Sequence, residues 1–81
     1  MKPKHCTPNA IEIGNNIRKV RQLKNYKQEH LADKLNITTA SLSKIENGKT
    51  DISLSRLYEV AKALEIKIEK LFIDPCVMLN K

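Results

Sequence analysis

The side chains best suited to contact a nucleotide lie between residues 38 and 49. If this segment is helical, Leu42 and Ile45 point to one side, because a helix turns by about 100° per residue. The opposite side then carries four residues at spacings i, i+3, i+4 and i+7: Ala40, Ser43, Lys44 and Asn47. Most of these side chains are short, which lets a helix come close to base edges. The segment therefore predicts a polar helix face that can lie along a groove of duplex DNA.

Individual side chains decide what this face can contact. Lys44 can donate hydrogen bonds to guanine O6 and N7 or to a phosphate, and Thr39 and Ala40 can contact a thymine methyl group. Helices are expected to begin near Gln28 and just after Thr38, and their first N–H groups and positive dipole ends suit phosphate oxygens. The amide of Gln28 can also donate to a phosphate. The sequence thus predicts both base and backbone contacts.

No arrangement of residues points to catalysis, to a cofactor or to a metal ion. The sequence has no nucleophile placed beside a base and no glycine-rich phosphate loop. His5 and Cys6 lack the paired spacing of a zinc site. Cys6 and Cys76 are expected to be reduced thiols, and a disulfide between them stays an open alternative. We therefore predict a protein that is not an enzyme and carries no cofactor.

Length and charge fit one small domain with an anionic partner. The chain has 81 residues, with 15 Lys and Arg against 9 Asp and Glu, which gives a net charge of +6. This surplus favours approach to a polyanion without identifying one. No apolar stretch has the length of a membrane span, and the N-terminus lacks the features of a secretory signal. We expect a cytoplasmic, nucleoid-associated protein with no membrane partner.

Apolar residues recur with a helical period along most of the chain, and no segment alternates like a strand. The pattern predicts helices over approximately residues 12–24, 28–35, 39–47, 54–64 and 67–73. Asn25 and Asn36 suit the left-handed conformation at helix ends. Thr38 and Ser53 can cap the helices that follow them, and Gly48 can end the third helix. His30 is expected to face solvent, and Tyr58 is expected to serve packing rather than function.

The connection between the second and third predicted helices is very short. Only Asn36 and Ile37 separate the second helix from Thr38. Two helices joined so tightly must cross at a steep angle. Ala32 is small enough for close approach, and Ile37 can fill the corner between the helices. We expect the third helix to stand out from the body as a ridge.

The expected architecture is all-α and compact. We assign residues 1–10 to a flexible N-terminal tail, 11–74 to the helical domain and 75–81 to a C-terminal tail. The third helix would offer its polar side to solvent, because only a narrow apolar stripe faces inward.

Several segments together resemble the Xre-type helix-turn-helix domain of phage repressors and Cro proteins. The matching residues are Ile17-Arg18-Lys19-Val20-Arg21, Gln28, Leu31-Ala32, Leu42-Ser43-Lys44-Ile45-Glu46-Asn47-Gly48-Lys49, Leu57 and Ala61-Lys62-Ala63-Leu64. The match runs from about residue 13 to residue 72. It departs from the family pattern at Asn25 and Asn36, where the family often has glycine. The resemblance implies a five-helix, lambda-repressor-like fold with the helix-turn-helix at helices 2 and 3.

The resemblance also implies a role for each matched residue. Gln28 would contact a phosphate, and Asn47 and Lys49 would approach the DNA backbone. Arg21 and Glu46 would form a buried ion pair between the first and third helices. Base contacts would come from the residues that match the family's reading positions: Thr39, Ala40, Ser43 and Lys44.

We hypothesise a sequence-specific, double-stranded DNA-binding transcription regulator, a repressor or controller, that acts as a homodimer. The alternative is a helix-turn-helix antitoxin or protein-interaction module whose main partner is another protein, such as a toxin. The dimer surface is left open between two interpretations of the apolar C-terminal residues. These residues form the dimer contact or cover the bottom of their own monomer: Leu71, Phe72, Ile73, Val77, Met78 and Leu79.

Overall fold

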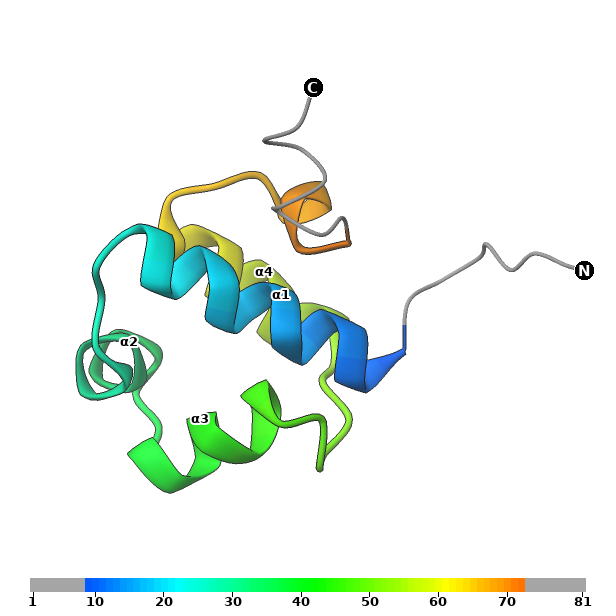
Figure 1. Ribbon diagram of the computed structural model, residues 1–81, viewed down its shortest axis with the longest axis horizontal. Coiled ribbons are helices and arrows are strands. Elements are labelled where there is room, and N and C mark those ends of the chain that lie inside the picture. Colours follow the sequence, from blue (N-terminus) through cyan, green and yellow to red (C-terminus); the bar gives the residue numbers. More distant parts are fainter. Residues whose placement is uncertain (1–8, 73–81) are drawn as a thin grey trace, which may run out of the picture.

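The structure is a computed structural model that describes residues 9–72. Over that range it contains four α-helices, one short 3₁₀ helix and no strand. The elements are α1 (Ala10–Leu23), α2 (Gln28–Leu35), α3 (Thr39–Glu46), α4 (Leu54–Leu64) and the 3₁₀ helix η1 (Ile68–Phe72). Figure 1 shows α1 across the middle, with α4 behind it, η1 above it and α3 below it. The all-helical architecture expected from the sequence is confirmed for these residues.

The first helix begins two residues before its predicted start. Asn9 caps it, because its side-chain oxygen accepts a hydrogen bond of 2.9 Å from the backbone N–H of Glu12. The Glu12 carboxylate in turn accepts from the backbone N–H of Asn9 at 3.3 Å, which completes a capping box. The rest of the expected tails, with both cysteines, lies outside the described residues.

A left-handed residue follows each of the four α-helices, and after α3 it is Gly48, with a φ angle of 72°, as the sequence predicted. Asn25 and Asn36 have φ angles of 63° and 61°, as their residue type predicted. Glu65 also has a φ angle of 61°, which the sequence did not indicate. Two other details differ from the prediction. The third helix ends one residue early, with Asn47 as its C-cap, and the last helical segment is a 3₁₀ helix.

The core draws on every helix. Each of the four α-helices and η1 contributes at least one fully buried large side chain: Ile17, Leu31, Leu42, Leu64 and Leu71. The amide of Asn16 donates a buried hydrogen bond of 2.8 Å to the carbonyl oxygen of Leu71, so η1 is tied to α1. Leu71 therefore packs into the core of its own monomer and is not available as a dimer contact. Phe72 is 38% exposed, and the other apolar residues in that set lie outside the described range.

Tyr58 was expected to serve packing, but it does not pack into the core of residues 9–72. Tyr58 is 57% exposed, because it lies on the side of α4 that turns away from the buried residues Leu57, Val60 and Ala61. His30 is exposed, as expected.

The helices α1 and α3 approach each other most closely at Gly14. A Cβ atom built at Gly14 would collide with the carbonyl oxygen of Ile45 and lie 2.8 Å from that of Glu46. Both obstacles are backbone atoms, so neither can rotate aside. The glycine is required here for close packing of the two helices.

We predict that Gly14→Ala destabilises the protein by about 1–3 kcal/mol, because the added methyl group overpacks the α1–α3 contact. Helix propensity alone would predict a gain of up to about 1 kcal/mol, so the two effects differ in sign. Urea unfolding followed by circular dichroism measures the difference. Gln22→Ala, at an exposed position of the same helix, is the control and should stay within about 0.5 kcal/mol of wild type. An unchanged or more stable Gly14→Ala variant would contradict the packing argument.

Candidate nucleic-acid interface

A two-residue turn sets the position of α3. Asn36 has a left-handed backbone, and the backbone N–H of Ile37 donates a hydrogen bond of 3.0 Å to the carbonyl oxygen of Ala32. Thr38 then caps α3, since its hydroxyl oxygen accepts from the backbone N–H of Ser41 at 3.0 Å. Ile37 is half-buried and packs against the core, and Ala32 is buried. The turn thus has the features that its sequence predicted.

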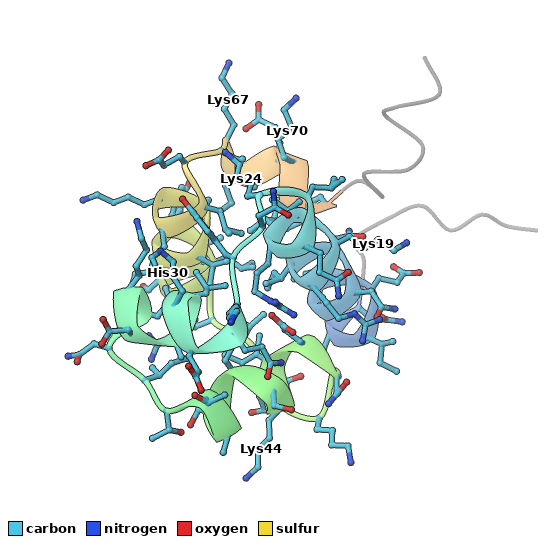
Figure 2. All side chains as sticks on the ribbon, turned by 60° about the vertical axis from the view of Figure 1, so that its left-hand side comes forward. Lys19, Lys24, His30, Lys44, Lys67 and Lys70 are labelled. Carbon is cyan, nitrogen blue, oxygen red and sulfur yellow. The ribbon has the colours of Figure 1, made fainter. Side chains whose placement is uncertain are left out.

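The two sides of α3 differ in burial. Leu42 and Ile45 are buried in the core. The predicted contact residues lie on the other side and are exposed, except that Ser43 is half-buried: Thr38, Thr39, Ala40, Ser43, Lys44, Asn47 and Lys49. Figure 2 shows Lys44 pointing away from the body, at the opposite end of the molecule from Lys24, Lys67 and Lys70. Nothing in residues 9–72 covers this face of α3.

Polar side chains along this face also bond to one another. The amide of Asn47 lies 3.4 Å from the hydroxyl of Ser43, one turn away. The hydroxyl of Thr38 donates to that of Ser41 at 3.0 Å. Such bonds limit the conformations of short side chains before any ligand arrives.

A buried carboxylate holds the inner side of α3 to the other helices. Glu46 is 1% exposed, and its two oxygens accept from Arg21 Nε at 2.7 Å and Arg21 Nη2 at 3.1 Å. Arg21 Nη1 donates to the carbonyl oxygen of Tyr26 at 2.8 Å. The pair therefore links α1, the turn after it and α3. A charge buried so deeply is tolerable only because both oxygens of the Glu46 carboxylate accept hydrogen bonds from the Arg21 guanidinium.

Gln28 belongs to the same network, which the sequence did not reveal. Its amide nitrogen donates to Glu46 Oε1 at 3.0 Å, and the side chain is half-buried. An amide NH₂ group has two hydrogens, so one remains to donate elsewhere. The structure thus places Gln28 beside the C-terminal end of α3, where one residue can touch both the network and an external group.

A hollow of about 480 Å³ runs along the side of α3 toward the start of α4. It adds residues that the sequence analysis did not single out. Arg56 reaches it from α4 and forms an exposed ion pair of 2.9 Å with Glu59. The polar residues that line the hollow are Ser41, Lys44, Thr50, Asp51, Ser53 and Arg56. Periodicity could not find this set, because it joins three separate segments.

Residues 9–72 show neither a membrane-spanning helix nor a cluster of metal ligands. None of the helices there has the length and hydropathy needed to traverse a lipid bilayer. No group of three or more His, Cys, Asp or Glu residues is arranged there to hold a metal ion.

The family model for helix-turn-helix proteins matches residues 17–71, which is most of the chain. The chain belongs to this family. The resemblance to Xre-type helix-turn-helix domains that was inferred from the sequence is thereby confirmed.

Two relatives match this helix-turn-helix chain over most of their own length. An uncharacterized HTH-type transcriptional regulator of Methanocaldococcus jannaschii is 41% identical, over 73% of this chain and 89% of the relative. Control protein C.MunI of a Mycoplasma species is 35% identical, over 79% of this chain and 88% of the relative. Other relatives are longer. The match spans 57% of an uncharacterized transcriptional regulator from the ATPase CF(0) region of Rhodospirillum rubrum.

Solved structures show the same arrangement of helices. The restriction-modification controller protein C.AhdI from Aeromonas hydrophila superposes with a TM-score of 0.74 at 28% identity, over 78% of this chain and 96% of that one. SinR, a master regulator for biofilm formation, was solved in complex with DNA. It superposes with a TM-score of 0.67 at 32% identity, over 75% of this chain and 98% of that one.

We predict that Glu46→Ala destabilises the fold by about 3–5 kcal/mol, because it leaves the Arg21 guanidinium buried without its partner. The double variant Arg21→Met/Glu46→Met should lose much less than the sum of the two single changes, since apolar side chains remove both charges together. A double-mutant cycle by urea unfolding measures this coupling.

The exposed Arg56–Glu59 pair serves as the control for that cycle. Its partners are 35% and 58% exposed, and its coupling should be below about 1 kcal/mol. Equal coupling energies for the two pairs would show that burial of Glu46 has no special importance.

Proposed function

We propose that this protein is a sequence-specific transcription regulator that binds double-stranded DNA by inserting α3 into the major groove. The observation that carries the proposal is the exposed polar side of α3, held outward by the two-residue turn and anchored inward by buried Glu46. In this interpretation α2 and α3 form the helix-turn-helix, and η1 stands as the fifth helix of a lambda-repressor-like domain. The relatives named as transcriptional regulators support this class of function.

Base contacts come from the outward residues of α3. Lys44 donates to guanine or to a phosphate, and Thr39 and Ala40 offer methyl groups to thymine. Ser43 lies on the same face but is half-buried, so its short side chain contacts only a base edge that lies close to the helix. These residues set which sequence is bound, whereas contacts to the backbone set where the domain sits.

Backbone contacts flank the base contacts on both sides. Gln28 keeps one N–H for a phosphate while it holds Glu46. The N-terminal end of α3 at Thr38 offers N–H groups and a positive dipole end. Asn47 and Lys49 are exposed just beyond the other end of α3. The net charge of +6 adds a salt-dependent attraction to any duplex.

A single α3 can read only a short sequence. Its eight residues span roughly 12 Å, which is a few base pairs of the groove. We therefore infer a homodimer that reads two half-sites about 34 Å apart on the nucleoid DNA. The similarity to two restriction-modification and control proteins supports a role as a controller or repressor, in preference to an antitoxin.

Selection of bound sites from random duplex DNA by the purified chain tests the proposal as a whole. We expect enrichment of a short motif that occurs twice with opposite orientation, at a spacing of about one helical turn. Recovery of random sequence after repeated rounds would refute sequence-specific binding.

We predict that Lys44→Ala weakens binding to the selected site by about 1–3 kcal/mol and weakens binding to random duplex much less. The physical reason is that a base contact is lost from one sequence, whereas a phosphate contact is lost from all sequences. Fluorescence anisotropy with both duplexes gives the two affinities.

Lys67→Ala is the matched control, because it removes the same charge from the end of the molecule opposite Lys44 (Figure 2). It should leave the ratio of the two affinities unchanged. If Lys44→Ala and Lys67→Ala had equal effects on both duplexes, Lys44 would not be a base-reading residue.

A further inference from the structure

The carboxylate of Glu46 has a second neighbour besides Arg21, and that neighbour lies on a different helix. Glu46 Oε1 accepts from Arg21 Nη2 at 3.1 Å and from the amide of Gln28 at 3.0 Å. Glu46 and Arg21 are both buried, whereas Gln28 is half-buried at the first residue of α2. Of these three side chains, Gln28 is therefore the one that an external group can reach.

The charge of Glu46 decides which end of the Gln28 amide faces it. An ionised carboxylate only accepts hydrogen bonds, so it binds the NH₂ end of an amide and repels the carbonyl end. The last torsion angle of a glutamine has no sharp preference of its own, so a free amide samples both orientations. The bond from Gln28 to Glu46 therefore holds this amide in one orientation, with one N–H still available.

We propose that Glu46 is a positioning residue for the contact between Gln28 and a DNA phosphate. By holding the amide, Glu46 keeps the remaining N–H of Gln28 in the direction in which it donates to the phosphate. This inference rests on the proposed function, because it takes the duplex to lie against the start of α2. The donor is ordered before DNA arrives, so binding does not have to immobilise the side chain.

Arg21 makes this arrangement compatible with a phosphate nearby. A carboxylate close to the DNA backbone would repel it, but the two bonds from Arg21 place a positive charge directly against Glu46. Glu46 is also the last residue of α3. The phosphate contact and the reading helix thus share one anchor, so a contact made through Gln28 sets where α3 lies relative to the duplex.

NMR order parameters of the side-chain amides test the first step in the free protein. The chain has two glutamines, and the other one, Gln22, is exposed on α1. We expect an ordered amide at Gln28 and a mobile one at Gln22. In Arg21→Met/Glu46→Met, the amide of Gln28 should become mobile. Glu46→Gln keeps the shape of the side chain and gives the same comparison if the double variant does not fold. A Gln28 amide that stays ordered in folded protein without Glu46 would overturn the proposal.

Binding to a random duplex, measured by fluorescence anisotropy, tests the second step. Gln28→Ala should weaken binding of the otherwise wild-type chain by about tenfold, because a hydrogen bond to a charged group is lost. The same change made in Arg21→Met/Glu46→Met should cost less than about threefold, since the amide is no longer held there. The dependence of affinity on salt should not change, because a neutral amide displaces no counterion. Gln22→Ala is the matched control and should leave binding unchanged.

The outcomes separate this proposal from the proposed function. Equal losses from Gln28→Ala in the two backgrounds would overturn the role of Glu46 while leaving DNA binding intact. A loss confined to the selected site would also overturn it, because Gln28 would then act only through the position of α3. A wild type that binds neither the selected nor the random duplex would instead refute the proposed function.

Discussion

The bidentate contact between Arg21 and Glu46 is the interaction on which the presentation of α3 depends. It closes the space between α1 and α3 with a paired charge that is nearly inaccessible to water. Gln28 extends the contact to α2, so three helices meet at one carboxylate. A carboxylate in that position fixes the rotation of α3 about its own axis, because any rotation of the helix would break the hydrogen bonds from Arg21 and Gln28 to Glu46. That rotation decides which side chains face outward.

The outer face of α3 follows from this fixed rotation and from the narrow apolar stripe beneath it. Leu42 and Ile45 are enough to hold the helix because Gly14 lets α1 approach its backbone directly. Few apolar residues are then needed, and most positions on α3 remain available for contacts to a ligand. The residues that stabilise the fold therefore lie on one side of this short helix, and the residues that we propose to read DNA lie on the other side, where they can vary without loss of the fold.

The sequence predicted the parts of this fold that depend on local pattern. The helix positions followed from apolar spacing, and the turns at Asn25 and Asn36 followed from residue type. The sequence could not predict the positions and contacts that depend on tertiary packing. Periodicity does not distinguish an outer residue such as Tyr58 from a core residue at the edge of the stripe. The bond from Gln28 to Glu46 joins residues far apart in sequence, and a left-handed glutamate at Glu65 has no signal in its residue type.

The outward side of α3 is the surface that we propose to meet DNA. Amide chemical-shift mapping during titration with the selected duplex tests it most directly, because every position reports at once. We expect the largest changes at residues 39–47 and at Gln28, with little change at residues 67–71. Changes concentrated on α4 or η1, with α3 unaffected, would contradict it.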